Sequence, residues 1–357
     1  MQLDFFDQKA VSHYPSTRYQ GSKRKLIPAL SAIFSQHKFS TAIDLFSGSG
    51  SVTYLLRTLG KSVTSNDYLK YNANTASLFL SEVSDLDILN SKRELPSMLN
   101  DQPHKEGFAV RKNYSNIFFT DAENTQIDYF CKNVQSASAV VQKLLIYAVG
   151  QALLKKRPYN LFHRANLAMR LSDVERSFGN KVTWETSIEA HAIKTLNEIS
   201  KLSLQTFVTG SAMSENTNNL EYFPSNVDLI YLDPPYIPAK GKAIDYADFY
   251  GFLDGLLDYG LFEKPNIEIP HRPVLQSPSA WCTPKTARIE LLEILKKWKN
   301  SLVIMSYRGD GAFSPEDILS CFSLLGRNAT VECLGTYKYA LAHSIRSNEI
   351  LIISPPA

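Results

Sequence analysis

The residues best suited to chemistry in this chain are Asp233-Pro234-Pro235-Tyr236, which directly follow a run of β-forming residues, Val227–Leu232. The run predicts a buried strand, and the two prolines end it because proline fixes φ and donates no ladder hydrogen bond. A carboxylate, a rigid carbonyl and an aromatic ring are therefore expected together at the carboxyl end of a strand, where open α/β sheets bind ligands. By itself the motif is equally consistent with a proline-rich turn.

A second segment that could do chemistry lies near the N-terminus. Its predicted elements are strands Thr41–Phe46 and Ser62–Asp67, joined by helix Val52–Leu59. Gly48 and Gly50 in the first turn would let the backbone approach a ligand closely, with Asp44 before them. Asp67, at the tip of the second strand, suits the two hydroxyls of a ribose. Thr53 stands where the third glycine of a dinucleotide-binding turn belongs, so the pattern favours a nucleoside-bearing cofactor other than a nicotinamide dinucleotide.

The elements that must position these residues alternate between strand and helix at both ends of the chain. After the first unit, a mainly helical stretch intervenes, with helices predicted at Ala73–Val83, Ala122–Asn133 and Ala137–Leu154. The alternation resumes with helix Ala190–Lys201, strand Leu204–Val208, a turn at Gly210-Ser211-Ala212, helix Lys285–Trp298, strand Ser301–Tyr307, helix Pro315–Leu325 and an antiparallel pair, Val331–Tyr339 with Glu349–Ile353. This predicts an α/β fold with a doubly wound, Rossmann-like sheet, formed by residues 1–75 and 200–357, and a helical insert at residues 76–199.

The segment Lys155–Arg176 of the insert combines positive charge with aromatic residues. Six basic residues against two acidic ones give it a net charge of +4. Such a run is often an ordinary solvated helix face. Because Arg157-Pro158-Tyr159-Asn160 is more typical of a loop, we favour contact with nucleic acid, in which basic side chains neutralise phosphates and aromatics stack on bases. The residues expected to contact it are Lys155, Lys156, Arg157, Tyr159, His163, Arg164 and Arg170.

Composition is that of a globular protein of 357 residues, with 44% hydrophobic residues and a mildly basic net charge of +3. The four cysteines are scattered, without a CxxC pair or a nearby histidine at ligand spacing, so neither a disulfide framework nor a metal site is expected. The longest apolar run, Leu144–Leu154, is too short to cross a bilayer. The first ten residues carry acids and no cleavable hydrophobic segment. A cytoplasmic protein without a membrane partner is expected.

Taken together, the motifs resemble those of the Dam-like DNA adenine-N6 methyltransferases. The resemblance is carried by Tyr19-Gln20-Gly21-Ser22-Lys23, by Asp44-Leu45-Phe46-Ser47-Gly48-Ser49-Gly50, by Asn66-Asp67, by Asp233-Pro234-Pro235-Tyr236 and by Ser306-Tyr307. These motifs have the family's order and span most of the chain. One position departs from the family, because Ser211 follows the predicted strand Leu204–Val208 where many members carry an acid that contacts the cofactor's adenine.

The resemblance implies a methyltransferase sheet with a target-recognition insert, S-adenosylmethionine as cofactor and double-stranded DNA as partner. It implies that Tyr19, Lys23, Asp44, Phe46, Gly48, Gly50, Asp67 and Asp233 surround the cofactor, and that Lys23, Asp233, Pro234, Pro235 and Tyr236 form the catalytic set. The Asp233 carboxylate and Pro234 carbonyl would accept hydrogen bonds from an amino group, and Tyr236 would stack on the base. Such a base must leave the duplex stack.

The residues themselves leave alternatives open. A pair of acceptors beside an aromatic ring suits any exocyclic amine, so cytosine-N4 methylation is the nearest alternative, and RNA or a protein glutamine amide is a more distant one. A nucleotide-binding oxidoreductase and a catalytically silent DNA-binding module are alternatives from other classes. A cognate restriction endonuclease and a monomeric state are further expectations about partners.

Overall fold

The computed structural model describes residues 14–15, 17–103, 107–174, 181–202, 204, 209–239, 245–274, 279–337 and 347–357. Four sequence-based predictions lie wholly or partly outside these residues: the acidic N-terminal segment, positions 205–208 of one predicted strand, positions 175–176 of the basic segment, and positions 338–339 of another predicted strand.

Seven strands form one sheet: β1 (Thr41–Asp44), β2 (Ser62–Asn66), β3 (Gly210–Met213), β4 (Leu229–Leu232), β5 (Leu302–Arg308), β6 (Thr330–Tyr337) and β7 (Ser347–Ser354). The longer helices are α2 (Ile27–Phe34), α3 (Ser51–Thr58), α4 (Lys70–Leu80), α5 (Asp85–Asn100), α7 (Asp121–Asn133), α8 (Ala139–Lys155), α11 (Ile188–Ile199), α14 (Pro284–Lys297) and α15 (Pro315–Leu324). Shorter helices are η1 (Lys23–Leu26), α6 (Ala109–Tyr114), η2 (Val134–Ser136), η3 (Pro158–Asn160), α9 (Leu167–Leu171), α10 (Lys181–Glu185), η4 (Leu220–Tyr222), α12 (Tyr246–Tyr250), η5 (Gly251–Leu256), α13 (Gly260–Glu263) and η6 (Ala280–Cys282).

The strand order is β3-β2-β1-β4-β5-β7-β6. Strands β1 to β5 run parallel, whereas β7 pairs antiparallel with both β5 and β6. The chain leaves β1 toward β2 on one side, and β4 lies on the other side, so β1 and β4 flank the point where the direction of winding reverses. In open α/β sheets that point is where ligands bind. This mixed α/β architecture, with its mostly parallel sheet, is consistent with a methyltransferase fold.

Helices cover both faces of the sheet, and strand β4 shows why. All four of its residues are buried. Leu229 and Tyr231 pack with the hydrophobic cluster that includes α2, α3 and α4, while Ile230 and Leu232 pack with the cluster that includes α14 and α15. Successive side chains of a strand point to opposite faces, so a strand covered on both faces reads as a continuous apolar run.

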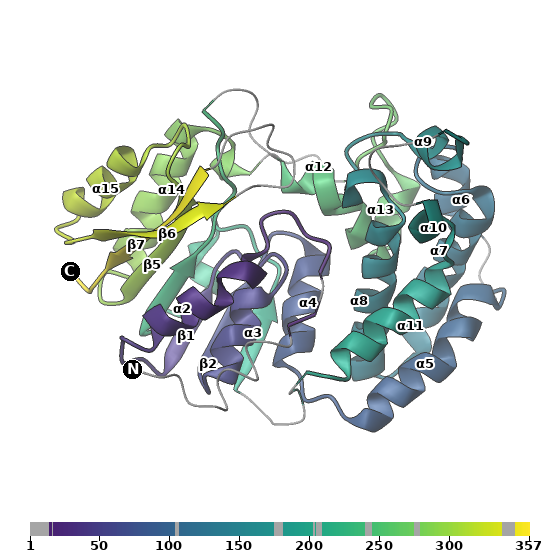
Figure 1. Cartoon of the computed structure of the whole chain (residues 1–357), viewed down its shortest axis with the longest axis horizontal. Helices are drawn as coiled ribbons and strands as arrows, with labels where there is room; N and C mark the ends of the chain where they lie inside the picture. Colours follow the sequence, from purple (N-terminus) through teal and green to yellow (C-terminus); the bar gives the residue numbers. More distant parts are fainter. Residues whose placement is uncertain are drawn as a thin grey trace.

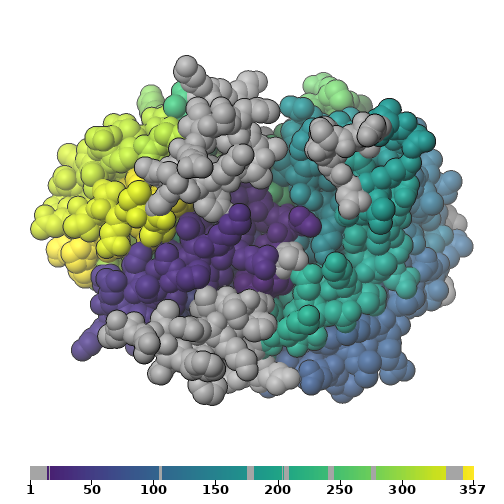
Figure 2. Space-filling view, in the orientation of Figure 1, coloured from purple at the N-terminus to yellow at the C-terminus, as the bar shows by residue number. Residues whose placement is uncertain are grey.

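The helices between α4 and β3 form a second half of the molecule beside the sheet (Figure 1). Helix α8 lies at its centre, packed against α4, α5 and α11. The short helices α12, η5 and α13, which come from a later part of the chain, also pack on this half, through η5 with α4, α7 and α8 and through α13 with α6. Figure 2 shows the N-terminal segment, in purple, lying between the C-terminal strands and the helical half.

The two halves share one hydrophobic cluster, because residues of α8 such as Leu144 and Val149 belong to the same buried set as Leu229 of the sheet. Helix α4, which was predicted as part of the helical stretch, packs on β2 and β3 and thus covers the sheet. None of the helices in the described part of the chain is long and apolar enough to cross a membrane.

The turn predicted at Gly210-Ser211-Ala212 is wrong, whereas most of the strand predicted at Leu204–Val208 lies outside the described residues. The structure has β3 at Gly210–Met213, parallel to β2, in the residues that were predicted as a turn. A glycine beside small residues is typical of a turn, but here the absence of a side chain is required by packing. A Cβ on Gly210 would lie 2.7 Å from the Val63 carbonyl oxygen. Tertiary contact therefore overrides the local preference.

Candidate active site

The turn after β1 requires glycine at two positions, because the backbone there is left-handed and side chains would collide with neighbouring rings. Gly48 and Gly50 have positive φ angles of 49° and 75°, which residues with a side chain rarely adopt. A Cβ on Gly48 would lie 3.0 Å from the Tyr19 ring, and a Cβ on Gly50 would lie 2.7 Å from the Phe79 ring. The turn leads directly into α3, and Gly48 lines the neighbouring pocket.

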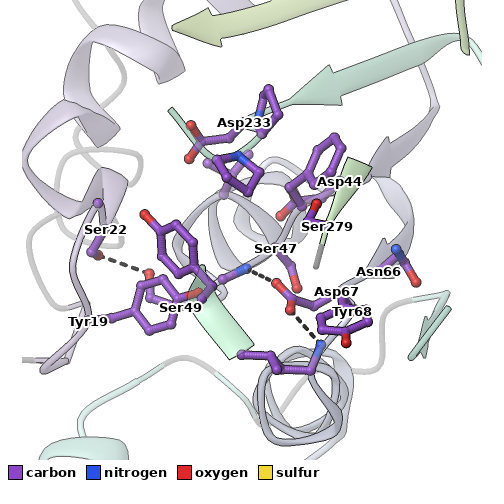
Figure 3. A pocket seen from close by; sticks show the side chains of 18 of the residues that line it. Tyr19, Ser22, Asp44, Ser47, Ser49, Asn66, Asp67, Tyr68, Asp233 and Ser279 are labelled. Carbon is purple, nitrogen blue, oxygen red and sulfur yellow. Dashed lines mark hydrogen bonds between the residues drawn. The ribbon is translucent and has the colours of Figure 1, made fainter. Parts of the chain in front are cut away.

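Asp67, which follows β2, is fixed against this turn. One carboxylate oxygen accepts a hydrogen bond from the Gly48 amide at 2.8 Å, and the other accepts from the Leu69 amide at 2.9 Å and the Asn72 side chain at 3.1 Å. Figure 3 shows the first two of these bonds and the position of Asp67 at the pocket. Burial raises the pKa of Asp67, and its hydrogen bonds oppose that rise. The carboxylate is thus held in one orientation.

Asp44, the last residue of β1, is 1% exposed and has one oxygen bound and one without a partner among the described residues. Thr53 donates to Oδ2 at 2.7 Å, and its hydroxyl also lies 2.7 Å from that of Ser65. Thr53, which stands in place of a third glycine, therefore orients the acid. Burial raises the pKa of Asp44 to about 7. An unpaired buried acceptor beside a pocket suits a ligand that brings a hydrogen-bond donor.

The Asp233-Pro234-Pro235-Tyr236 motif follows β4, the strand next to β1. Asp233 is 17% exposed, and one of its oxygens lies 2.7 Å from the Lys23 ammonium and accepts from the Tyr236 hydroxyl at 3.0 Å. Burial raises the pKa of Asp233 to about 6; Lys23 opposes the rise, and the nearby Glu349 carboxylate adds to it. Around neutral pH the Asp233 carboxylate is thus mostly ionised.

Lys23 reaches this motif from η1, at the other end of the sequence. It is 5% exposed, donates to the Tyr236 hydroxyl at 2.8 Å and lies 3.3 Å from a carboxylate oxygen of Glu349. Burial lowers the pKa of Lys23, but Asp233 and Glu349 more than offset this and raise it above the ordinary value. The Lys23 ammonium is therefore charged and shared between two carboxylates.

Aromatic rings form one wall of the site. Tyr19 stacks on Tyr250 with ring centroids 4.5 Å apart, and on Tyr246 at 5.7 Å. The Tyr19 hydroxyl accepts a hydrogen bond from Asn72 at 3.0 Å. On another side, the half-buried Phe46 meets Trp281 edge to face at 5.5 Å.

A single pocket brings the predicted cofactor-binding and catalytic residues together, although they are distributed over more than 200 positions of the sequence. The predicted residues that line it are Tyr19, Lys23, Asp44, Phe46, Gly48, Asp67, Asp233, Pro234, Pro235 and Tyr236. Gly50 does not line it, but its neighbours Ser49 and Ser51 do. Figure 3 shows the acids after β1, β2 and β4 gathered at this pocket. Such a site can hold a polar ligand with an apolar ring and place it beside Asp233.

Sequence reasoning missed several residues of this pocket: Ser22, Tyr68, Glu215, Asn216, Thr217, Asp245, Tyr246 and Ser279. Glu215 lies two residues after β3, and its amide donates to the Asn66 side chain at 2.9 Å. A correct prediction of β3 would have identified Glu215 as a candidate site residue. Ser211, which was noted as a departure from the family, lies exposed within the strand, so the position after β3 belongs to Ser214 and Glu215 instead.

The structure does not support DNA contact by four of the seven predicted residues. Lys155, Lys156, Arg157 and Arg170 are 7%, 2%, 1% and 6% exposed. Lys156 and Arg170 pair with the carboxylate of Glu123 at 3.0 and 2.8 Å. Charged side chains that are buried and bound to protein acceptors hold the helical half together and do not present charge to a phosphate.

Arg157 shows most clearly that a predicted DNA contact is instead bound by the protein itself. Its guanidinium donates to the carbonyls of Leu161, Phe118 and Arg164 and to the side chain of Asn166. It also lies over the Phe118 ring at 4.4 Å. The run of basic residues looked like a surface feature because sequence alone does not show which carbonyls surround a helix end.

The other three predicted DNA-binding residues lie at or near the surface. Tyr159 is 43% exposed, Arg164 is exposed, and His163 is half-buried. Tyr159 and Asn160 have positive φ angles of 62° and 57°. Because a bulky aromatic residue seldom adopts this conformation, the loop holds Tyr159 outward at a cost in backbone strain.

Comparison with known proteins agrees with the motifs. The sequence profile of the family described as "D12 class N6 adenine-specific DNA methyltransferase" matches residues 19–254. The chain is 26% identical over 324 residues to the type II methyltransferase M2.HphI of Haemophilus parahaemolyticus, covering 89% of this chain and 90% of that protein. It is 22% identical over 360 residues to the type II methyltransferase M.FokI of Planomicrobium okeanokoites, covering 93% of this chain and 51% of that protein.

These matches decide between the alternatives that the residues alone left open. The family is described as specific for the N6 amine of adenine, so the comparison supports adenine over cytosine-N4 methylation and a methyltransferase over an oxidoreductase. The family match covers the glycine turn, the Asp-Pro-Pro-Tyr motif and the whole helical half. The chain belongs to the D12 class of N6 adenine-specific DNA methyltransferases.

Proposed function

We propose that this enzyme uses S-adenosylmethionine to methylate adenine in double-stranded DNA, and that the pocket around Asp44, Asp67 and Asp233 is its active site. The observation that carries the proposal is the convergence of these three carboxylates at the ends of β1, β2 and β4, on either side of the winding reversal. S-adenosylmethionine supplies a methyl group that its sulfonium has already activated.

The residues present fit this cofactor. Asp44 keeps an unpaired buried oxygen that can accept from the ammonium of the methionine portion. Asp67 is oriented by Gly48 and Leu69 and retains lone pairs for two ribose hydroxyls. Phe46 and Glu215 also line the pocket, and we propose that Phe46 faces the adenosine portion and that Glu215 contacts the adenine. The resemblance to the family implies these assignments, and the donors and acceptors present are compatible with them.

The Asp-Pro-Pro-Tyr motif is suited to an adenine amine, which is a poor nucleophile because its lone pair is delocalised into the ring. The Asp233 carboxylate and the Pro234 carbonyl can each accept a hydrogen bond from one N–H of the amine and draw the nitrogen toward tetrahedral geometry. Pro234 and Pro235 together hold both acceptors rigid. As positive charge develops on the nitrogen, the carboxylate stabilises it. The Tyr236 ring lines the pocket and can stack on the base.

Access to that amine requires the base to leave the duplex, at a cost of a few kcal/mol. We propose Tyr159, His163 and Arg164 as DNA contacts that help to offset this cost. Their segment is joined to the wall of the pocket, because the Phe162 amide donates to the Phe249 carbonyl at 3.0 Å and the His163 ring lies 5.0 Å from the Phe249 ring. Phe249 belongs to α12, which also carries Tyr246 and Tyr250.

The biological setting is inferred from the relatives. Both are named type II methyltransferases, and we propose that this chain likewise protects DNA within a restriction–modification system with a cognate endonuclease. We propose that the enzyme acts as a monomer. Residues 76–199 are proposed as the target-recognition part and the sheet as the catalytic part.

The test is transfer of labelled methyl from S-adenosylmethionine to duplex DNA, followed by identification of the methylated base and mapping of the methylated positions. N6-methyladenine at a defined short site is expected. Asp233→Ala should abolish transfer while calorimetric binding of the cofactor persists. Wild-type protein that binds the cofactor but modifies no adenine in any duplex would contradict the proposal.

A further inference from the structure

Glu349 is a buried acid behind the pocket to which the proposed mechanism gives no role. It lies on β7, paired in register with Arg308 of β5, and only 2% of it is exposed. It does not line the pocket. Its sequence context, at the start of a predicted C-terminal strand, gave no indication of chemistry.

One carboxylate oxygen of Glu349 contacts the side chains of Tyr236, Ser306 and Lys23. It accepts from the Tyr236 hydroxyl at 2.5 Å and from the Ser306 hydroxyl at 2.6 Å, and it lies 3.3 Å from the Lys23 ammonium. Lys23 and Tyr236, which contact Asp233, therefore both contact Glu349 as well. The Tyr236 hydroxyl has a single proton, so the two carboxylates compete for it.

We propose that Glu349 is a positioning residue for methyl transfer, which holds Lys23 and Tyr236 on the buried side of Asp233 and gives the cluster a net negative charge. This inference rests on the proposed function of the pocket. With Glu349, one ammonium is shared by two carboxylates, and the cluster carries a charge of about −1. Without Glu349, the Lys23 ammonium and the Asp233 carboxylate would form an ion pair with no net charge, and Lys23 would hold the Asp233 oxygens toward itself.

The net charge matters because methyl transfer moves positive charge onto the adenine nitrogen next to Asp233. Fixed negative charge in a site shielded from water stabilises such a transition state. The titratable groups that interact with Asp233 come from five segments: Lys23 of η1, Asp44 of β1, Tyr231 and Tyr236 around β4, Tyr246 of α12 and Glu349 of β7. Lys23 is the one cation in this set.

The same geometry predicts a pH signature. Methyl transfer requires Asp233 in its ionised form, and the Glu349 carboxylate contributes to the raised pKa of Asp233. Replacing Glu349 with the neutral but isosteric glutamine removes a negative neighbour. The pKa of Asp233 should then fall, and the acid limb of the activity profile should move to lower pH.

The experiment compares Glu349→Gln with Glu123→Gln in the full-length enzyme. Glu123 is the matched control, because it is also a shielded carboxylate shared between two cations, Lys156 and Arg170, but lies outside the pocket. For each variant, kcat is measured against pH with duplex DNA, together with KM for DNA, calorimetric affinity for S-adenosylmethionine and the melting temperature.

For E349Q we expect kcat to fall at least tenfold at pH 7.5, with KM and cofactor affinity within twofold of wild type and the acid limb shifted to lower pH. For E123Q we expect a lower melting temperature with an unchanged pH profile. E349Q with wild-type kcat and an unshifted acid limb would overturn the inference while leaving the proposed function intact. Inactive wild-type enzyme would instead count against the proposed function.

A second variant covers the case in which E349Q does not fold. Ser306→Ala removes the 2.6 Å donor to Glu349 without changing any charge. We expect a three- to tenfold loss of kcat, with unchanged cofactor affinity and an acid limb at the wild-type pH. Wild-type kcat in S306A would then show that the orientation of Glu349 does not matter for transfer.

Discussion

Two arginines of one short segment should behave in opposite ways when each is replaced by methionine. Arg157 is buried and bonded to protein acceptors, whereas Arg164, seven residues further along the chain, is exposed. Methionine keeps much of the apolar stem and removes the charge. The pair therefore separates a structural arginine from one that is available to DNA, within the same loop and with the same substitution.

For Arg157→Met the structure predicts a loss of stability. The Phe118 carbonyl keeps the Arg170 guanidinium as a donor at 3.0 Å, and the Arg164 carbonyl belongs to an exposed residue and can turn to water. The Leu161 carbonyl and the Asn166 side chain lose their donor. An unsatisfied buried acceptor costs about 1–3 kcal/mol. The variant no longer has to bury a guanidinium, whose pKa is lowered by desolvation, and this offsets part of the cost. We therefore expect the free energy of unfolding to fall by about 2–4 kcal/mol.

For Arg164→Met the expected effect is on DNA binding. An exposed side chain away from packing changes stability by less than about 0.5 kcal/mol. If Arg164 neutralises one phosphate, the slope of log K against log salt concentration becomes shallower by about 0.9. Affinity should weaken to a similar degree on duplexes with and without the target site, because a phosphate contact carries no base information.

The assays are urea unfolding and DNA-binding titrations at several salt concentrations. The reasoning is refuted if R157M unfolds at the wild-type urea concentration but shows the shallower salt dependence. That result would mean that Arg157 leaves its carbonyl acceptors to meet a phosphate. A wild-type salt slope in R164M, with normal folding, would remove Arg164 from the interface.

Three further results are expected. Thr53→Val removes the hydroxyl that donates to Asp44 at 2.7 Å, so affinity for S-adenosylmethionine should fall about tenfold by calorimetry, and unchanged affinity would mean that this bond does not prepare the site. Because the pKa of Asp233 is raised to about 6 and its ionised form is required, kcat should decline as pH falls through about 6; activity that stays flat down to pH 5 would contradict this. Gly50→Ala places a Cβ 2.7 Å from the Phe79 ring at a φ of 75°, and should lower the melting temperature by several degrees, corresponding to about 1–3 kcal/mol; a wild-type melting temperature would show that the turn can relax.

Much of the candidate site could be predicted from the sequence because its parts are locally encoded. A glycine pair after a short strand, an acid at the end of the next strand, and a double proline that ends a buried strand each restrict the backbone within a few residues. The carboxyl ends of parallel strands meet at one edge of the sheet, so Asp44, Asp67 and Asp233 were expected together. The structure places them around one pocket.

The helices were predicted where apolar residues recur at helical spacing, as in α8 and α14. Strand β3 could not be found in this way. Its four residues, Gly210–Met213, have little β propensity, and only the register with β2 makes them a strand. Because β3 was not predicted, Glu215, which lies just after that strand, was not predicted as a pocket residue.

The sequence by itself determined where the chain must turn, which carboxylates stand at strand ends and which residues can grip an amine, because covalent geometry and local patterning act over a few residues. Only the tertiary structure decided the environment of each charge. Lys155, Lys156, Arg157 and Arg170 are buried and bind a hydroxyl, carbonyls and a carboxylate of other segments, and Glu349 reaches Lys23 across 326 residues of sequence. Burial and ion pairing depend on which distant segments share a core, and no local pattern records that.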